Sequence, residues 1–381
     1  MAAPEREPAR VLRVLGTRGV PAAHGGFETF AERLALHLVA RGWQVTVYCQ
    51  LDGSGPVVDD EWQGIRRVRI PVAASGPSST ILFDWKATRH AARRPGLCLT
   101  LGYNTAVFCA LLRLVRVPNI INMDGIEWRR AKWGRLARLW FRINEQAGVW
   151  LADHLVADHP QIQAHLARST RADKITMIPY GADRLGGLSD APVRSLGLEP
   201  GRYLTLIARP EPENSVLELV QGFSRQPRGF ALAVLGGYGD DQPYHRAVRA
   251  AASDEVRFLG PIYDRHVVDA LRLHGAAYLH GHRVGGTNPS LVEALGAGNA
   301  VIAHDNPFNR WVAGAAARYF GDADDVAALL DEILANRDAL EPLRAAAWQR
   351  FEAEFTWPRV LQAYEQLLLQ WLPGAQGRAA R

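Results

Sequence analysis

Cysteine is scarce in this sequence, and its scarcity argues against two kinds of protein. Only three cysteines occur among 381 residues. Each of them, Cys49, Cys98 and Cys109, lies in an apolar run without the paired spacing of a zinc site. An odd number of dispersed cysteines is also unlike the disulfide framework of a small secreted domain. We therefore expect three reduced, buried thiols in a cytoplasmic protein.

Long apolar runs and blocks of one charge are missing too. No run approaches the ~18 apolar residues that a membrane-spanning helix needs, and residues 1–10 are too polar for a secretory signal. The formal charge of +5 and the isoelectric point near 9.3 fit nucleic acid, an anionic membrane or a phosphorylated substrate. Arginines spread over solvated surfaces would give the same balance. Because no Lys/Arg block marks a nucleic-acid tail, we expect no nucleic-acid partner.

Several common site motifs are absent as well. The glycine-rich turn at residues 16–26 follows a strand, but it lacks the G-x-G-x-x-G spacing of a dinucleotide site. The next strand ends in Cys49-Gln50, where a ribose-binding acid would be expected. There is no Walker A sequence and no G-x-S-x-G elbow. These absences argue against a nicotinamide-dependent oxidoreductase, a P-loop enzyme and a serine hydrolase of the common fold.

One acidic motif has the spacing of a metal site. Asp322-Ala323-Asp324 has the D-x-D pattern of a metal-dependent transferase. It stands at the start of an expected helix, where acids act as caps and interact favourably with the helix dipole. We interpret it as a cap and expect no metal site.

What the sequence does contain is an alternation of strands and helices that runs twice. In the first half, a helix with a 3.6-residue apolar period is expected at residues 27–41, between the first two strands. The strands of this half are expected at Val11–Leu15, 45–49, 68–72, Leu97–Leu101, Asn119–Asn122, His154–Ala157 and 175–178. The second half restarts with a helix at 216–224 and strands at 203–208, Ala231–Leu235, 256–259, 276–280 and 300–303. Buried strands alternating with helices predict parallel sheets that are covered on both faces.

The pattern predicts an α/β protein with two doubly wound, Rossmann-like domains facing a central cleft. The break falls in the Gly/Pro-rich, aperiodic segment 185–201, which gives an N-terminal domain at 1–187 and a C-terminal domain at 188–356. Helices are expected at 324–336, 338–353 and 357–372, and the last is expected to pack back on the N-terminal domain. Residues 373–381 are expected to form a flexible tail.

The most informative segment is 280–295, where an apolar strand ends in a Gly-rich turn and Pro289 opens a helix. Such a corner aims free backbone N–H groups and the positive end of a helix at one point, which suits a phosphate. Glu293 lies one turn inside the helix, where its carboxylate could accept hydrogen bonds from a ribose. The segment therefore predicts a nucleotide-sugar site at the carboxyl end of a parallel sheet.

Four segments carry a resemblance to a known family. They are Gly16-Thr17-Arg18-Gly19-Val20-Pro21 with Gly25-Gly26-Phe27-Glu28-Thr29; Asn122 to Trp133, which reads NMDGIEWRRAKW; Gly285-Gly286-Thr287-Asn288-Pro289-Ser290; and Ile178-Pro179-Tyr180-Gly181-Ala182-Asp183. With these, the chain resembles the retaining glycosyltransferases of the GT-B fold in the large family-4 group. Within that group it is similar to bacterial rhamnosyltransferases of polysaccharide assembly.

The resemblance implies a donor site in the second half of the chain. Arg209 matches the position that holds the donor pyrophosphate, although a surface arginine at a strand end is the alternative. Asn214 stands where the wider family often has a lysine, so backbone N–H groups near Gly286 and Thr287 would contribute more. Glu293 matches the ribose-binding glutamate, whereas Gly285 replaces the first glutamate of the family pair. Asn288 and Tyr263 complete the implied donor contacts, Tyr263 by stacking on the base unless it is a packed core tyrosine.

The acceptor side is expected in the first half. Gly25 and Gly26 open a helix toward the cleft, where absent side chains allow a ligand to come close. Asp124 follows the strand Asn119–Asn122 and is the first candidate for orienting the acceptor hydroxyl or the donor sugar. Glu127 is the second candidate, and for both acids a capping role is the alternative. Tyr103 and Asn104 end another strand at the same face.

The segment 128–150 combines tryptophan, arginine and leucine. Basic and aromatic residues together suit a helix on an anionic bilayer, where a lipid-linked acceptor would be anchored. A helix with buried aromatics and solvated arginines is the alternative. We therefore expect a cytoplasmic protein, with peripheral contact to the inner membrane face as one of two interpretations.

The resemblance implies an enzyme that moves L-rhamnose, or a similar 6-deoxyhexose, from dTDP-L-rhamnose to a hydroxyl with retention of configuration. The acceptor would be a saccharide or a lipid-linked saccharide. Arg209, Asp124 and Glu127 would act in catalysis, with neither a cofactor nor a metal. Transfer from another UDP- or GDP-sugar and a nucleotide-sugar epimerase on the same fold are the alternatives.

Overall fold

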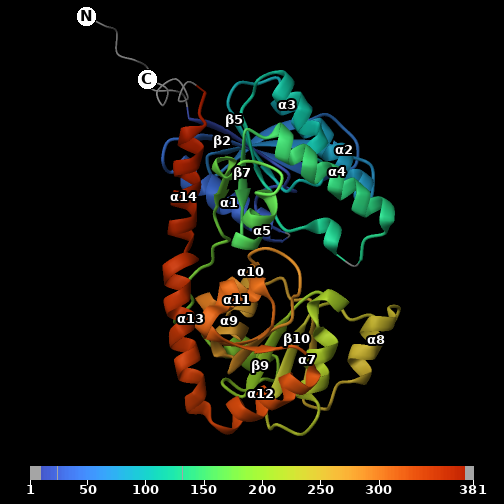
Figure 1. The fold of residues 1–381 in the computed structure, drawn as a ribbon, viewed down its shortest axis with the longest axis vertical. Coiled ribbons are helices and arrows are strands. Elements are labelled where there is room, and N and C mark those ends of the chain that lie inside the picture. The colour runs from blue at the N-terminus through green and yellow to red at the C-terminus, as the bar shows by residue number, and fades with distance from the viewer. Residues whose placement is uncertain (1–9, 24, 131, 374–381) are drawn as a thin grey trace, which may run out of the picture. The chain divides into compact units, whose positions relative to one another are not determined.

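The chain forms two compact units (Figure 1). The structure is a computed structural model, and it describes residues 10–23, 25–130 and 132–373. Unit 1 comprises Met1–Pro179 and Trp357–Arg381, and unit 2 comprises Tyr180–Thr356. The division falls after Pro179, earlier than the boundary expected at 187/188. Of the expected tail at 373–381, only Pro373 is among the described residues.

Unit 1 is built on an eight-stranded sheet with the order β3-β4-β2-β1-β5-β6-β7-β8. Its strands are β1 (Val11–Leu15), β2 (Gln44–Asp52), β3 (Val58–Trp62), β4 (Ile65–Val72), β5 (Leu97–Leu101), β6 (Asn119–Asn122), β7 (His154–Ala157) and β8 (Ile175–Met177). All neighbours pair in parallel except β3, which runs antiparallel to β4 at the edge. The expectation of a wholly parallel sheet missed β3, because its sequence VDDEW is polar and mostly exposed.

The helices of unit 1 cover both faces of this sheet. They are α1 (Gly26–Val39), α2 (Pro77–Ala91), α3 (Ala110–Leu114), α4 (Arg135–Leu151), α5 (Pro160–Leu166) and α14 (Trp357–Gln370). The terminal helix α14 packs on α1, where the rings of Phe30 and Tyr364 lie 4.6 Å apart. Glu365 of α14 accepts a hydrogen bond from the Trp43 indole at 3.3 Å and lies 3.2 Å from His37 Nε2.

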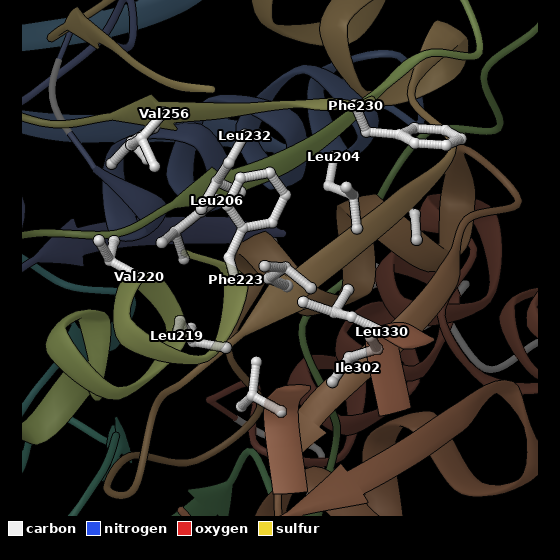
Figure 2. Close-up of a cluster of buried hydrophobic side chains, with 14 of the residues drawn as sticks. Leu204, Leu206, Leu219, Val220, Phe223, Phe230, Leu232, Val256, Ile302 and Leu330 are labelled. Atoms are coloured by element: carbon white, nitrogen blue, oxygen red, sulfur yellow. The ribbon is translucent and has the colours of Figure 1, made fainter. Parts of the chain in front are cut away.

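Unit 2 contains a six-stranded parallel sheet with the order β11-β10-β9-β12-β13-β14. Its strands are β9 (Tyr203–Ile207), β10 (Ala231–Leu235), β11 (Val256–Gly260), β12 (Ala277–His280), β13 (Ala300–His304) and β14 (Ala317–Phe320). Alternate residues serve opposite faces, as the pleat requires. Leu204 and Leu206 join one apolar cluster with α7 and α12, shown in Figure 2, whereas Tyr203 joins another on the α9 side.

The helices of unit 2 are α6 (Ala191–Ser195), α7 (Val216–Phe223), α8 (Pro243–Ala250), α9 (Arg265–His274), α10 (Pro289–Gly296), α11 (Pro307–Ala313), α12 (Ala323–Ala335) and α13 (Leu340–Glu354). Asp322 caps α12 by accepting hydrogen bonds from the backbone N–H groups of Asp324 and Asp325 at 2.9 and 3.0 Å. The interpretation of the D-x-D motif as a helix cap is confirmed for Asp322. Asp324 instead pairs with Arg225.

The strand orders place one topological switch point in each sheet. In unit 1 the chain winds from β1 to β2 on one side and returns to β5 on the other. In unit 2 the strands β9 and β12 are related in the same way. Loops diverge at such points and leave a crevice beyond the carboxyl ends of the two strands, which is where ligands bind in doubly wound sheets. The two-domain, Rossmann-like fold predicted from the sequence is confirmed.

Buried thiols were also expected, and the structure agrees. Cys49, Cys98 and Cys109 are free and buried. Among the helices of the described chain, none is both long and apolar enough to cross a membrane.

Candidate functional site

In unit 2, the predicted donor residues gather at the β9/β12 switch point. Arg209 is exposed on the loop that follows β9, and the segment 281–288 follows β12. Backbone hydrogen bonding joins the two loops, because the Arg283 N–H donates to the Glu213 carbonyl at 2.9 Å. The Arg283 guanidinium adds bonds to the Ser215 hydroxyl at 2.7 Å and the Glu218 carboxylate at 2.5 Å. The two loops therefore form one connected wall.

Asn214 stabilises this wall from inside. Its side chain is buried, and its amide donates to the backbone carbonyl of Arg209 at 2.9 Å. Asn214 stands where the wider family often has a donor-binding lysine, and a contact between Asn214 and the donor stays a prediction. The structure shows a bond that fixes the backbone carrying Arg209.

Close backbone approach explains Gly281 in this wall. A Cβ added at Gly281 would lie 2.1 Å from the Asn214 carbonyl oxygen and 3.0 Å from Leu219 Cδ1. Only glycine fits where two backbones come this close. Gly281 was assigned no role from the sequence, although it lies inside the glycine-rich motif.

The turn between β12 and α10 has the features of an anion site. Gly285 has a φ of +137°, which favours glycine, and Thr287 is buried. Asn288 caps α10 by accepting a hydrogen bond from the Ser290 N–H at 3.0 Å, and Pro289 occupies the first turn. Backbone N–H groups at the start of a helix combine with the helix dipole to favour an anion. Asn288 was expected to contact the donor, and in the structure its side chain acts as this cap.

Glu293 lies one turn into α10 and is partly exposed. Its Oε2 accepts a hydrogen bond from Arg272 Nη2 at 2.5 Å, and its side chain is 30% exposed. Arg272 binds one oxygen of the Glu293 carboxylate and so fixes the orientation of that carboxylate. The other carboxylate oxygen is left for a ligand. Glu293 is therefore a paired and oriented carboxylate rather than a solvated helix residue.

Tyr263 lies apart from this group along the sheet edge. It follows β11, two strands from β9, and is 86% exposed. The alternative of a packed core tyrosine is therefore wrong. A stacking role at the base stays a prediction.

Two stacked imidazole rings, those of His280 and His282, lie where β12 ends and the turn before α10 begins. His280 ends β12, is buried, and has no hydrogen-bond partner on either ring nitrogen among the described residues. Its ring lies 4.5 Å from that of His282 at an interplanar angle of 12°. Burial, with His282 and His304 nearby, holds the pKa of His280 well below its usual range. His280 is therefore neutral, and it supports the turn by stacking rather than by its charge.

In unit 1, the predicted acceptor-side residues surround the carboxyl ends of β5 and β6. Gly25 precedes α1 and Gly26 is its first residue. Tyr103 is buried, and its hydroxyl accepts a hydrogen bond from the Glu127 N–H at 2.8 Å. The exposed Asn104 offers its carbonyl to the Trp140 indole at 2.9 Å. The expected strand ends are thus linked to the segment after β6.

The two candidate catalytic acids have different surroundings. Asp124 has a left-handed φ of +52°, and its N–H donates to the Asn122 side chain at 3.0 Å. Glu127 forms an ion pair with Arg130 at 2.6 Å and accepts a hydrogen bond from the Trp133 indole at 3.3 Å. Glu127 is therefore engaged in holding its own loop, and no side-chain cap is present on the short turn that it starts.

A cavity of about 1160 Å³ opens in unit 1 beside these residues. Its lining includes Arg18, Glu28, Asn104, Glu127 and Trp140. A smaller adjoining cavity of about 160 Å³ reaches Asp84 on α2. The sequence did not single out Glu28 as a candidate site residue, although Glu28 lies within the Gly25–Thr29 segment. Nor did the sequence single out Asp84, whose only signal was an acid on the apolar face of a helix.

No cluster of three His, Cys, Asp or Glu side chains in the part of the chain described could hold a metal ion. The charged groups at both switch points are arginines and separate carboxylates. They suit hydrogen bonding to hydroxyl and phosphate groups.

Comparisons with known families agree with this architecture. Residues 217–366 match the family described as glycosyl transferase-like. Residues 9–183 match a family described as a domain of unknown function, DUF1972. None of the curated proteins matches this chain.

Solved structures share the fold over nearly the whole chain. Sucrose-phosphate synthase from Thermosynechococcus elongatus is 20% identical with a TM-score of 0.77, covering 95% of this chain and 98% of its own. HepE of Anabaena, in complex with UDP and glucose, is 14% identical with a TM-score of 0.74, covering 94% and 99%. The UDP-forming trehalose-phosphate synthase from Burkholderia xenovorans, in complex with glucose-6-phosphate, is 13% identical with a TM-score of 0.71, covering 94% and 100%. At these identities the likeness concerns the fold. The chain therefore has the two-domain GT-B fold, and its residues 217–366 match the glycosyl transferase-like family.

Proposed function

We propose that the protein transfers a sugar from a nucleoside diphosphate to a hydroxyl group, with the donor bound at the β9/β12 switch point of unit 2. The observation that carries the proposal is the bonded wall of two loops that presents Arg209 together with the start of α10. An exposed guanidinium, the backbone N–H groups at the helix start and the oriented Glu293 carboxylate supply the partners that a diphosphate and a ribose need. The match of residues 217–366 to a glycosyl transferase-like family supports the same reaction.

The chemistry follows from charge development at the leaving group. As the bond between the sugar C1 and the phosphate oxygen breaks, negative charge grows on the departing diphosphate. Arg209 and the N–H groups at 286–288 stabilise that charge, because they are already oriented. The acceptor hydroxyl oxygen attacks C1 from the same face and passes its proton to the departing phosphate oxygen, so the configuration is retained. An arginine and a helix N-terminus offset part of the charge on the diphosphate, and we propose that the transfer needs no metal.

For the donor we propose dTDP-L-rhamnose or a related 6-deoxyhexose donor. Support comes from the sequence segments that resemble bacterial rhamnosyltransferases, above all the Gly285 to Ser290 turn. A second candidate is a UDP-hexose such as UDP-glucose. It is favoured by the fold neighbours that carry UDP in their structures, among them HepE in complex with UDP-glucose.

The test is turnover of a donor panel by the purified protein in the presence of EDTA. Release of nucleoside diphosphate from dTDP-L-rhamnose, UDP-glucose and GDP-mannose is measured with and without a panel of methyl glycosides, and the products are identified. Arg209→Ala should lower kcat about 10²–10³-fold, the cost of losing one oriented donor. Arg257→Ala is the matched control, because Arg257 is exposed on the edge strand β11. Equal turnover by both variants would refute the site, and isomerised donor without acceptor would indicate an epimerase.

We also propose peripheral contact between unit 1 and an anionic membrane through one face of α4. Leu136, Leu139 and Ile143 of this helix are 84%, 55% and 48% exposed. Arg135, Arg138 and Arg142 accompany them, whereas the acid of the helix, Glu145, is buried and bonded to Trp128 and His165. An exposed apolar row flanked by arginines fits an interface with anionic lipid.

The aromatic residues of the segment 128–150 divide between two roles. Trp133 packs on Phe141 with ring centroids 5.0 Å apart, whereas Trp150 is 70% exposed.

A vesicle flotation assay tests the membrane contact. The protein should float with phosphatidylglycerol vesicles and should not float with phosphatidylcholine vesicles. Leu136→Glu in α4 should abolish flotation. Val57→Glu, which changes an exposed residue just before β3, should leave flotation intact. Flotation that is insensitive to Leu136→Glu would exclude this face.

A further inference from the structure

We propose that the cavity at the β1/β5 switch point of unit 1 binds a neutral saccharide, and that Asp84 accepts a hydrogen bond from one of its hydroxyl groups. The inference rests on the proposed function, because it names the class of acceptor. Asp84 would be a positioning and specificity residue on the acceptor side. It lies outside the segments through which the chain resembles known transferases.

The location of the cavity is the first support. Its smaller part is lined by Leu15, Gly16 and Thr17 at the end of β1 and by Thr100 and Leu101 at the end of β5. These two strands flank the switch point of the sheet, where doubly wound folds bind ligands. The cavity is therefore in the place that the topology reserves for a ligand in unit 1.

The close approach of β1 and β5 also explains a residue of the glycine-rich turn. Gly16 has a φ of +76°, and a Cβ there would lie 2.1 Å from the Leu101 carbonyl oxygen. A side chain at this position would therefore push apart the ends of β1 and β5, which line the small cavity.

The chemistry of Asp84 is the second support. Asp84 projects from the core face of α2 with Phe83, Ala87 and Ala91, which are buried apolar residues. One carboxylate oxygen accepts a hydrogen bond from the Thr105 hydroxyl at 2.8 Å. Within the described ranges of the chain, the other oxygen has no hydrogen-bond partner and the carboxylate has no ion pair. A buried acid without a counter-ion is costly, and such groups concentrate at functional sites.

The electrostatics of Asp84 agree with this placement. Burial raises the pKa of Asp84 to about 6, and the Thr105 hydrogen bond opposes the rise. The group therefore ionises near neutral pH without a cation beside it. Its second oxygen is available to a hydroxyl donor that enters the cavity.

The walls of the cavity point to a carbohydrate. The small and large cavities adjoin, because they share the lining residues Arg18, Glu28, Gln50, Thr80, Asn104 and Thr105. The large cavity adds an aromatic wall of Trp133, Trp140 and Phe141. Aromatic faces together with short polar side chains suit a molecule with apolar CH faces and many hydroxyls. At about 1160 Å³ the large cavity exceeds the ~300–1,000 Å³ of typical ligand pockets, which favours more than one sugar ring.

The charges favour a neutral ligand over a phosphorylated one. Glu28 lines both cavities and accepts hydrogen bonds from the Arg18 backbone N–H at 3.0 Å and the Thr17 hydroxyl at 3.4 Å. Two arginines of the large cavity, Arg67 and Arg69, are both bonded to Asp60. Arg18 also lines the small cavity, but it is exposed, so solvent screens its charge. The small cavity therefore presents two carboxylates, and an anionic group would be repelled from Asp84.

A stability measurement separates this role from a structural one. Because the folded pKa of Asp84 lies above its usual value of 3.8, the contribution of Asp84 to the stability of the folded protein falls as the pH rises from 3.8 through about 6. Asp84→Asn removes the buried charge but keeps an oxygen for Thr105. The variant should therefore be at least as stable as the wild type at pH 7.5. Asp173→Asn, which changes an exposed acid of unit 1, is the matched control.

The experiment compares three readouts for wild type, Asp84→Asn and Asp173→Asn. Calorimetry measures nucleoside diphosphate binding, donor hydrolysis without acceptor measures the donor site, and saturation-transfer NMR with methyl glycosides measures acceptor binding. Asp84→Asn should leave the first two unchanged and weaken methyl glycoside binding roughly 10- to 150-fold, the worth of one charge-assisted hydrogen bond. Trp140→Ala, from the wall of the large cavity, should also weaken glycoside binding.

Each other outcome has a distinct meaning. Nucleotide binding with glycoside affinities that are unchanged in Asp84→Asn overturns this inference and leaves the proposed function standing. Absence of nucleotide binding in the wild type overturns the proposed function itself. A loss of stability in Asp84→Asn at pH 7.5 marks Asp84 as structural and also overturns the inference. Glucose 6-phosphate that binds wild type more tightly than methyl glucoside overturns the neutral class of ligand.

Discussion

Replacement of Gly281 by alanine tests the wall between the β9 and β12 loops most sharply. The added Cβ would lie 2.1 Å from the Asn214 carbonyl oxygen, an atom of the backbone that cannot rotate away. Relief requires the two loops to separate by about 1 Å, because carbon and oxygen in contact lie more than about 3 Å apart. Gly281 does not have a positive φ, so the effect is steric rather than conformational.

The magnitude follows from which bonds this movement breaks. The Arg283 N–H to Glu213 bond at 2.9 Å joins the two loops and depends on their spacing. The Asn214 amide to Arg209 carbonyl bond at 2.9 Å lies within the β9 loop, so a shift of Asn214 moves the backbone that carries Arg209. Overpacking of this kind typically costs about 1–3 kcal/mol of stability. A displacement of about 1 Å at a reacting site can cost about 10²-fold in rate. We therefore expect Gly281→Ala to bind nucleoside diphosphate more weakly and to turn over about 10²-fold more slowly.

The assay is calorimetric titration with nucleoside diphosphate, followed by turnover and by hydrogen exchange of unit 2. Gly237→Ala is the control, because Gly237 lies in the same unit, does not have a positive φ, and has no heavy atom within 4 Å of an added Cβ. The control should match the wild type in all three measurements. If Gly281→Ala also matches the wild type, the loops do not form a close-packed wall and the reasoning about the donor site is refuted.

Three further predictions concern unit 1. Tyr364→Phe should cost about 1–3 kcal/mol, because it removes the acceptor of the buried Asn122 amide at 2.8 Å, and faster hydrogen exchange in β6 and α14 would show the loss. Burial raises the pKa of Cys98 and Cys109 to about 12, so a thiol reagent at pH 8 should label them only after denaturation; fast labelling of the native protein would contradict their burial. Burial lowers the pKa of His90 to about 4, so unfolded His90 binds a proton before folded His90 does, and the contribution of His90 to the stability of unit 1 should fall as the pH falls from 6.5 toward 4. Because buried Asp84 contributes in the opposite direction over that range, the measurement compares wild type with His90→Gln, and an identical pH dependence of the two denaturation midpoints would contradict this prediction.

Periodicity in the sequence predicts most of the fold. Buried strands such as Leu97–Leu101 are continuous apolar runs, and runs of this kind separated by helices leave little choice but parallel sheets with two covered faces. The edge strand β3 could not be found in this way, because its pairing with β4 uses ion pairs rather than apolar contacts. Arg66 of β4 binds Asp59 at 2.6 Å, and Arg67 binds Asp60 at 2.7 Å. A strand held by such ion pairs has no apolar run to mark it.

The location proposed for the donor site follows from local signals. The glycine-rich turn, Pro289 and the helix that follows form a continuous segment whose spacing alone predicts an anion site. The bond from Asn214 to the Arg209 carbonyl was not predictable, since it depends on the angle at which the loop leaves β9. The pairing of Glu293 with Arg272 joins two different helices and leaves no trace in either sequence.

The residues of the proposed acceptor cavity were harder to predict, because they come together only in the folded unit. Asp84 lies on α2 and its partner Thr105 follows β5, so neither residue belongs to a shared motif. An acid on an apolar helix face was the only available signal. Glu127 stood out as an acid after a strand, but its ion pair with Arg130 became visible only in the structure.

The most direct test of the central claim is calorimetric titration of the purified protein with dTDP, UDP, GDP and NAD, without added metal. We expect binding of a nucleoside diphosphate, with dTDP preferred, and weaker binding in Arg209→Ala and Glu293→Ala. Preference for UDP or GDP would keep the sugar transfer and replace the proposed donor. Binding of NAD alone, or of none of the four, would contradict the claim.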